Sequence, residues 1–307
     1  MKSFAFSSRD IYLHVLGTAS QVPTANRNHN GYLFRWKDEG LLFDPGEGAQ
    51  RQLVLANVSA NKITRVFLSH FHGDHCLGLP GIVQRLGLQD YAGTLEIYYP
   101  ASGRAYLDAL LSCSAYVSRI NIARRPIDGP ATVVDTPEFT VSARPLEHAI
   151  DTLGYVFQEK EKRRLDRAKL EAVGLLNSPL NRDLLRDGAV EVGGRRVRLE
   201  DVSELERGFK FGFLMDTRMF GGAEAIAKDA DLLLAESTYL DADARIAREH
   251  FHLCTTETAR LAKESGVKRL VITHFSQRYE DTSAFEREAK AVFPETIAAE
   301  DLMTLRL

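Results

Sequence analysis

The sequence predicts an α/β protein, a four-layer αβ/βα sandwich that carries an inserted flexible arm. Three observations support this prediction. Apolar runs of strand length recur along the chain, helical periodicity appears between and after them, and one charged internal stretch of about 50 residues interrupts the pattern. Because strands followed by helices occur twice over, we expect two sheets with helices on their outer faces.

The expected strands are short apolar segments. Some, such as Leu232-Leu233-Leu234-Ala235 and Leu270-Val271-Ile272, are almost continuously hydrophobic, which is typical of strands buried on both faces beneath helices. The segments lie at residues 11–16, 31–36, 40–43, 65–68, 95–99, 139–143, 154–158, 209–215, 231–235 and 269–273.

The expected helices repeat apolar residues at i, i+3 and i+4. They lie at residues 49–56, 81–88, 103–111, 255–265 and 283–292. Either Thr255 or Thr256 is suited to cap the fourth of these helices, and Gly266 is suited to end it.

The inserted arm is expected at about residues 159–207, where the buried-strand pattern stops. It opens with the charged run Glu159-Lys160-Glu161-Lys162-Arg163-Arg164 and contains few residues able to form a core. We expect the remainder of residues 1–307 to form a single domain around it.

The composition is ordinary for a soluble globular protein, with 44% hydrophobic and 26% charged residues. No stretch approaches the ~20 apolar residues that cross a bilayer, and residues 1–10 lack the apolar run of a signal peptide. A cytoplasmic protein without membrane contact is therefore expected. The net charge of −3 argues against a general nucleic-acid binder but leaves room for a local basic patch.

The three cysteines, Cys76, Cys113 and Cys254, are widely spaced and odd in number. A disulfide framework is therefore not expected, and no C-x-x-C pair indicates a structural zinc. We expect all three to be small core residues.

The segment Ser69-His70-Phe71-His72-Gly73-Asp74-His75 holds four potential metal ligands. The chain has nine histidines, and three of them fall in this one segment, which makes a chance cluster a poor explanation. A buried strand precedes the cluster, so the backbone turns at a strand end. His70 and His72 can then point to one centre while Asp74 and His75 point to a second.

This H-x-H-x-D-H motif resembles that of the metallo-β-lactamase fold hydrolases. Within that group the surrounding sequence is similar to the ribonuclease Z family, the tRNA 3′-processing endonucleases, over nearly the whole chain and in the same order. The matching stretches begin at Leu16-Gly17-Thr18-Ala19-Ser20, Leu42-Phe43-Asp44-Pro45-Gly46, Ser69-His70-Phe71-His72, Met215-Asp216-Thr217-Arg218, Ala235-Glu236-Ser237-Thr238 and Ile272-Thr273-His274-Phe275.

The resemblance implies three further ligands, His148, Asp216 and His274, and therefore two zinc ions per chain. Asp216 and His274 both follow buried-strand patterns, as the first cluster does. By the resemblance, one zinc takes His70, His72, His148 and Asp216, and the other takes Asp74, His75, His274 and the shared Asp216.

The resemblance also implies the residues that move protons. Asp74 matches the acceptor of the proton from the attacking water, while Glu236 and His252 match a pair that supplies a proton to the leaving group. Helix length favours His252 over His250, which stays an alternative. Arg218 and Arg278 follow ligands closely and are candidates for binding phosphate, although a surface arginine paired with a carboxylate is an equal alternative.

The arm lies where the family carries a tRNA-gripping element, and it opens with basic residues. A solvated charged helix is the competing interpretation on composition alone. Pro179 and Gly188 keep the family positions, whereas Ser178 replaces an expected glycine. The basic residues are Lys160, Lys162, Arg163, Arg164, Arg167 and Lys169.

Three functions are compatible with these features. The first is a zinc-dependent endoribonuclease that removes the 3′ trailer from precursor tRNA, leaving a 3′-hydroxyl on the tRNA and a 5′-phosphate on the trailer. The second is a hydrolase of a small phosphodiester or another ester, and the third is a non-catalytic RNA-binding protein. The complete ligand set argues against the third, and the arm argues against the second. By resemblance, a homodimer is expected.

Overall fold

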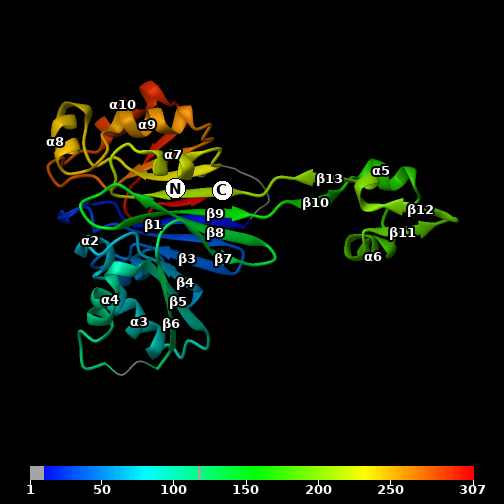
Figure 1. Ribbon diagram of the computed structural model, residues 1–307, viewed down its shortest axis with the longest axis horizontal. Coiled ribbons are helices and arrows are strands. Elements are labelled where there is room, and N and C mark those ends of the chain that lie inside the picture. The colour runs from blue at the N-terminus through cyan, green and yellow to red at the C-terminus, as the bar shows by residue number, and fades with distance from the viewer. Residues whose placement is uncertain (1–9, 117–118) are drawn as a thin grey trace. The chain divides into compact units, whose positions relative to one another are not determined.

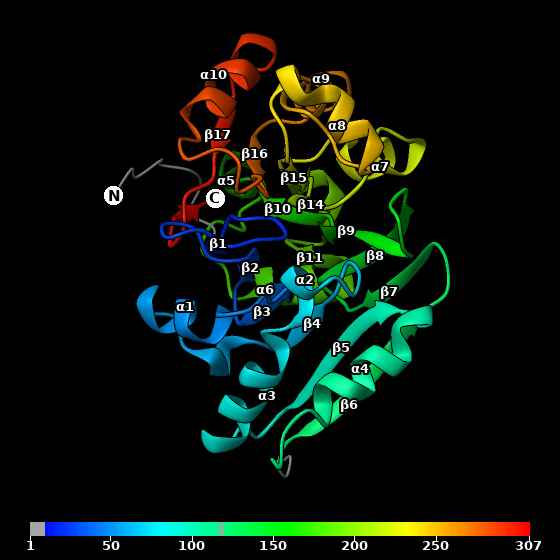
Figure 2. The same ribbon diagram turned by 90° about the vertical axis from the view of Figure 1, so that its left-hand side faces the viewer.

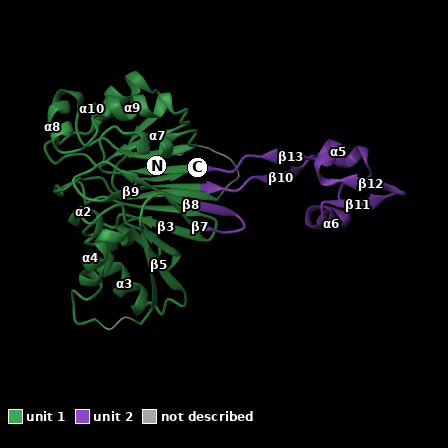
Figure 3. Ribbon diagram, viewed as in Figure 1, with its two compact units in different colours: residues 1–134, 141–157, 210–307 green, residues 135–140, 158–209 purple. Residues whose placement is uncertain are grey.

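The computed structural model describes residues 10–116 and 119–307, which form two compact units (Figure 3). One unit runs up to Val134 and takes in Val141–Phe157 and Lys210–Leu307, and the other consists of Asp135–Thr140 and Gln158–Phe209. The expected arm, residues 159–207, falls within the second unit. The expectation about a signal peptide concerns residues that are mostly outside the described part of the chain.

Two seven-stranded sheets contain most of the strands (Figures 1 and 2). The first has the order β18-β1-β2-β3-β4-β5-β6, with bounds Thr304–Arg306, Ile11–Gly17, Gly31–Trp36, Glu39–Phe43, Arg65–Phe67, Thr94–Pro100 and Asn121–Ile127. The second has the order β17-β16-β15-β14-β9-β8-β7, with bounds Thr296–Ala298, Leu270–Thr273, Leu232–Glu236, Lys210–Leu214, Thr152–Glu159, Phe139–Leu146 and Ala131–Asp135.

Helices cover the outer face of each sheet, which confirms the predicted αβ/βα sandwich (Figure 2). The first sheet is covered by α1 (Ala49–Leu55), α3 (Leu79–Leu88) and α4 (Arg104–Leu111). The second is covered by α7 (Gly221–Ala227), α9 (Thr255–Glu264) and α10 (Ser283–Val292), with α8 (Ala244–Glu249) nearby. Shorter helical turns are η1 (Ala60–Lys62), α2 (Gly73–Cys76), η2 (Ala101–Gly103) and η4 (Asp241–Asp243).

Aromatic side chains fill the space between the two sheets. Phe34 of the first sheet stacks on Phe211 of the second with ring centroids 4.6 Å apart, and Phe43 stacks on Phe213 at the same distance. Each fully buried ring contributes about 1.5–3 kcal/mol through its removal from water. Successive strand residues point to opposite faces, so the neighbour Leu33 packs toward the helices instead. This packing fixes the strand ends where the candidate site lies.

Helix α9 begins at Thr255, where the expected helix begins, but its N-cap residue differs from the prediction. Cys254, and neither Thr255 nor Thr256, is the N-cap residue, and its backbone N–H donates to the Glu257 carboxylate at 3.0 Å. The hydroxyl of Thr255 instead donates to the carbonyl of Tyr239. Gly266 follows the C-cap residue in the left-handed conformation, with φ of 70°, which agrees with its expected role in ending the helix.

The cysteine prediction is correct for two of the three residues. Cys76 and Cys254 are buried, but Cys113 is exposed near the end of α4, so its description as a core residue was wrong. All three are free thiols.

The second unit has a small hydrophobic core of its own, which the charged sequence did not indicate. Its elements are β10 (Lys162–Leu165), α5 (Arg167–Ala172), α6 (Leu180–Asp187), β11 (Ala189–Val192), β12 (Arg195–Arg198), η3 (Leu199–Val202) and β13 (Ser203–Glu206). The core residues are Leu170, Leu175, Leu184, Val197 and Val202. Pro179 precedes α6 and Gly188, with φ of 77°, ends it, which accounts physically for both residues.

None of the helices in the described part of the chain is long and apolar enough to span a membrane.

Candidate metal centre and active site

The candidate site residues lie at the carboxyl ends of strands. The cluster at residues 69–75 follows β4, and His148 follows β8. Asp216 comes two residues after β14, Glu236 is the last residue of β15, and His274 follows β16 directly. Strand ends brought together by the sheets therefore collect side chains that are far apart in the sequence.

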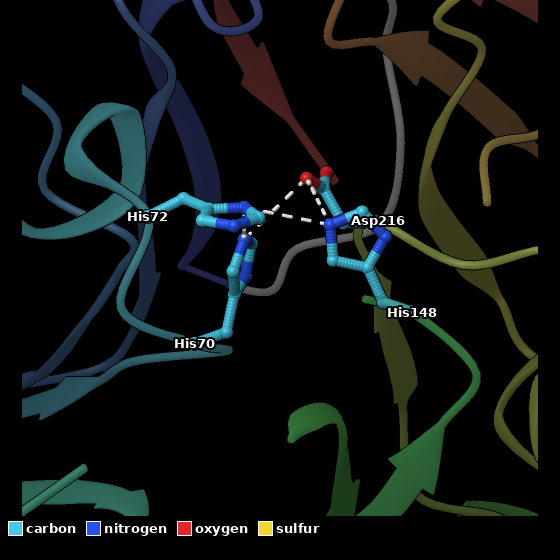
Figure 4. A group of neighbouring side chains, drawn as sticks. All are labelled: His70, His72, His148 and Asp216. Carbon is cyan, nitrogen blue, oxygen red and sulfur yellow. Dashed lines mark hydrogen bonds and ion pairs between the residues drawn. The ribbon is translucent and has the colours of Figure 1, made fainter. Parts of the chain in front are cut away.

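One group of ligand atoms is formed by His70, His72, His148 and Asp216 (Figure 4). Nδ1 of His72 lies 2.9 Å from Nε2 of His70 and 3.4 Å from Nε2 of His148. Oδ2 of Asp216 lies 3.5 Å and 3.6 Å from the same two Nε2 atoms. Ligands of a tetrahedral zinc at 2.0–2.1 Å are separated by roughly 3.3 Å, so these spacings suit that ion.

A second group is formed by Asp74, His75 and His274, with Asp216 beside it. Oδ2 of Asp74 lies 3.2 Å from Nε2 of His75 and 3.3 Å from Nε2 of His274. The Asp216 oxygens lie 3.3 Å and 3.2 Å from the same nitrogens. Asp216 therefore lies within ligand distance of both groups, as a residue shared by two ions must.

Three of the histidine rings are fixed by partners on their far sides. Nδ1 of His75 donates to the buried Asp44 carboxylate at 2.7 Å, and Nδ1 of His148 donates to the Phe251 carbonyl at 3.2 Å. Nδ1 of His70 lies 2.9 Å from the Ser69 hydroxyl, whose proton goes to Asp44 at 2.6 Å. Each ring is thereby held with Nε2 facing the centre, which is the arrangement that supports metal ligands in proteins.

Two buried polar atoms at the centre are without hydrogen bonds. Among residues 10–116 and 119–307, Nε2 of His75 and Oδ1 of Asp216 find no hydrogen-bond partner. Buried polar atoms are normally satisfied, so two unpartnered atoms within the candidate ligand groups are consistent with a site for a ligand. Imidazole nitrogens with carboxylate oxygens are the donor set of hydrolytic zinc sites, and the residues present fit two such ions.

Burial and neighbouring charges set the protonation states of the clustered residues. Burial raises the pKa of Asp74 and Asp216, but the neighbouring His75 and His274 outweigh it and hold both pKa values well below the usual range. Burial lowers the pKa of His70 well below its ordinary value, so this ring is neutral at pH 7. The carboxylates of Asp74, Asp216 and Asp44 in turn outweigh burial and raise the pKa of His75 well above its ordinary value, so this ring must release a proton when it binds a cation.

Three non-glycine residues of the site adopt the left-handed backbone conformation. The φ angles are 43° at Asp44, 44° at Asp216 and 64° at His274. Such conformations carry a cost of order 1–3 kcal/mol and persist where the surrounding structure imposes them. All three residues follow strands, so the turn out of the sheet aims their side chains at the centre.

Glu236 and His252 form a pair beside the ligand groups. Nδ1 of His252 lies 3.1 Å from each Glu236 carboxylate oxygen, and the Thr217 N–H donates to Glu236 Oε1 at 2.6 Å. Burial lowers the pKa of His252, but the Glu236 and Asp216 carboxylates outweigh it and raise the pKa to about 9. His250 is exposed at the end of α8. The geometry therefore favours His252 over the alternative.

Both candidate phosphate-binding arginines are paired with carboxylates. Arg218 contacts Glu147 and lies over the Phe251 ring at 4.8 Å. Arg278 lies 3.4 Å from Asp243, and its guanidinium is 5.0 Å from the centroid of the Tyr239 ring. In this structure both arginines therefore form ion pairs with carboxylates, which was the alternative to phosphate binding.

Two supporting residues were not identified from the sequence. Asp44 holds both Ser69 and His75, and the hydroxyl of Thr238 contacts Glu236 and His274. Both lie in the stretches that resemble the ribonuclease Z family. Asp44 comes directly after β3, and Thr238 comes two residues after β15. Position after such a strand was the available signal, because the candidate metal ligands share it.

The fold and the paired ligand groups define a metallo-β-lactamase-type hydrolase, and a family model of the metallo-beta-lactamase superfamily matches residues 25–160. The chain belongs to the ribonuclease Z family. It is 48% identical to a ribonuclease Z of Nocardia farcinica, covering 96% of this chain and 97% of the relative, and 43% identical to one of Chlamydia caviae, covering 94% of each. Human tRNase Z, short form, has a similar structure, with a TM-score of 0.71 at 28% identity over 96% of this chain and 98% of that one.

Proposed function

We propose that this chain is a zinc-dependent endoribonuclease that removes the 3′ trailer from precursor tRNA. The observation that carries the proposal is the pair of ligand groups sharing Asp216, with the Glu236–His252 pair directly beside them. The relatives named ribonuclease Z at 43–48% identity support tRNA as the substrate. The products would be a tRNA with a 3′-hydroxyl and a trailer with a 5′-phosphate.

Two zinc ions per chain would be held by the seven ligands already described. His70, His72, His148 and Asp216 would hold one, and Asp74, His75, His274 and Asp216 would hold the other. When bound, such ions stabilise negative charge on a phosphoryl group and lower the pKa of a water molecule toward neutrality.

The chain's own residues would move the protons of the hydrolysis. Oδ2 of Asp74, between His75 and His274, would accept the proton of the attacking water as its oxygen bonds to phosphorus. The bond from phosphorus to the O3′ atom of the tRNA then breaks, and His252 would donate a proton to that oxygen. Glu236 would keep the imidazole of His252 oriented for this transfer.

The second unit would bind tRNA through its basic side chains. Its exposed residues include Arg163, Arg164 and Arg167, which carry charge suited to phosphate. Other basic residues there are partly neutralised, since Lys162 lies 3.6 Å from Glu159 and Lys169 lies 3.3 Å from Glu204. Binding through arginine side chains would be electrostatic and would weaken as the salt concentration rises.

We also place the enzyme in the cytoplasm as a homodimer. Precursor tRNA as substrate supports the location, and the resemblance to the ribonuclease Z family supports the dimer. Light scattering of the purified chain tests the dimer. A homodimer should have twice the 34.3 kDa mass of one chain.

A substrate comparison tests the function. Zinc-loaded protein is incubated with a precursor tRNA that carries a 3′ trailer and, separately, with a chromogenic phosphodiester. Cleavage of the precursor at the trailer junction is expected. Hydrolysis of the small ester with an intact precursor would favour the alternative, a small-ester hydrolase of the same fold.

A further inference from the structure

We propose that Thr238 is a positioning residue that joins the metal centre to the Glu236–His252 pair. Its hydroxyl oxygen lies 2.6 Å from Oε2 of Glu236 and 2.9 Å from Nδ1 of His274. The same oxygen lies 3.3 Å from Nδ1 of His252. One side chain thus touches a candidate ligand and both members of the proton-donating pair. The inference rests on the proposed function.

The direction of each hydrogen bond follows from counting protons. The Thr238 hydroxyl has one proton, and the carboxylate of Glu236 can only accept, so the hydroxyl donates to Oε2. Its oxygen is then left to accept the proton on Nδ1 of His274. With Nδ1 protonated, Nε2 of a neutral His274 carries the lone pair. That atom lies 3.3 Å from Asp74 Oδ2 and 3.2 Å from Asp216 Oδ1.

The hydroxyl acts from a fixed position. Thr238 is 2% exposed, and its carbonyl accepts a hydrogen bond from the N–H of Ser276, in the turn that follows His274. The next residue, Tyr239, is bridged to Cys254. The backbone is therefore tied to the loop after β16 on one side and to the start of α9 on the other. A buried hydroxyl held in this way constrains the tautomer of His274 and the orientation of Glu236 together.

Removal of the hydroxyl should affect two properties that a purely structural threonine would not link. Without it, His274 loses the acceptor that fixes its tautomer, and the group of Asp74, His75 and His274 should bind zinc more weakly. Glu236 also loses one of the donors that hold its carboxylate against His252. Turnover should then fall even when enough zinc is present to fill both sites.

The experiment compares Thr238→Val and Thr238→Ser with a matched control, Thr255→Val. Thr255 is also buried and also a hydroxyl donor, but its partner is the Tyr239 carbonyl, which keeps the Thr255 N–H as a second donor. Zinc affinity is measured by competition with a chromogenic chelator, and kcat and KM are measured on precursor tRNA at saturating zinc. Nitrogen-15 NMR of the imidazoles reports the tautomers of His252 and His274. Circular dichroism checks folding, with Thr238→Ala as a second variant.

We expect Thr238→Val to bind one of the two zinc ions about 10–100-fold more weakly, as is usual for loss of a ligand's supporting partner. Its kcat should fall at least about 10-fold with KM within about twofold, and both imidazole signals should shift. Thr238→Ser should restore all three readouts, and Thr255→Val should resemble the wild type. Wild-type zinc affinity in Thr238→Val, unchanged kcat at saturating zinc, or equal losses in Thr255→Val would each overturn the proposal. If the wild type fails to cut precursor tRNA, the proposed function fails, while zinc affinity and NMR still decide the role of Thr238.

Discussion

The Nδ1 atom of His252 lies 3.1 Å from both carboxylate oxygens of Glu236, at the edge of the candidate metal centre. The carboxylate is fully buried and also accepts the Thr217 N–H, so it presents a fixed negative charge to the imidazole. Through this contact a buried strand end orients a partly exposed ring. The ring is thereby available to a leaving oxygen.

Replacement of His252 should slow turnover without loss of metal. For His252→Ala we expect kcat to fall about 10²–10⁴-fold, the usual contribution of a positioned acid, with KM for precursor tRNA little changed. His250→Ala is the matched control, because His250 is exposed two residues away. Steady-state kinetics at saturating zinc measure both. Equal losses in the two variants, or a near-normal His252→Ala, would remove His252 from the mechanism.

Metal removal should lower the stability of the fold as well as the activity. Without a cation, Nε2 of His75 and Oδ1 of Asp216 stay buried without hydrogen-bond partners in the described part of the chain. An ion that binds only the folded state stabilises it in proportion to its affinity. We expect a chelator to abolish cleavage and to lower Tm by several degrees, with recovery of both on addition of zinc. An unchanged Tm after complete zinc removal would contradict this account of the centre.

Deletion of the second unit should separate binding from chemistry. The N–H of Glu159 donates to the Phe209 carbonyl at 2.9 Å, so a short glycine linker can replace residues 160–207. We expect KM for precursor tRNA to rise at least about 10-fold while hydrolysis of a small phosphodiester is preserved, because phosphate contacts dominate nucleic-acid affinity. An equal fall in both activities would assign the unit a structural role.

His14 should make stability depend on pH. Its Nδ1 lies 3.0 Å from the Thr304 hydroxyl, across the pairing of β1 with β18. Burial, together with the charge of Arg35, lowers the pKa of His14 to about 4. In the unfolded chain the pKa of a histidine is about 6.5. The unfolded state therefore takes up a proton first, and stability present above pH ~6.5 is lost as the pH falls toward 4.

His14→Gln tests this dependence, since glutamine does not titrate. The free energy of unfolding in urea is compared at pH 7 and pH 5 for wild type and variant, both loaded with zinc. The decrease between the two pH values should be smaller in the variant. Parallel decreases would show that His14 does not contribute.

Much of the architecture was predictable because the inner strands of the two sheets are buried on both faces. The segments at residues 31–36 and 283–292 coincide with β2 and α10, where apolar periodicity is strong. Three-residue strands such as β17 and β18 are too short to show a period. The polar strands of the second unit were missed because their partners are polar too. Its core of five buried residues is too sparse to stand out in the sequence.

The candidate site was predictable in its ligands and less so in their supports. Local spacing alone indicated four candidate ligands, His70, His72, Asp74 and His75. The positions of His148, Asp216 and His274 came from the family resemblance. Asp44 and Thr238 act through contacts with residues distant in the sequence or on neighbouring strands. Such contacts form only when the sheets bring strand ends together, and no local pattern encodes them.

Mapping of the cleaved ends tests the central claim most directly. Precursor tRNA labelled at its 5′ end is cut by the zinc-loaded protein, and the termini of both products are identified by mass spectrometry. The account predicts a tRNA ending in a 3′-hydroxyl at the trailer junction and a trailer beginning with a 5′-phosphate. A 2′,3′-cyclic phosphate on the tRNA, or a precursor left intact by fully zinc-loaded protein, would contradict it.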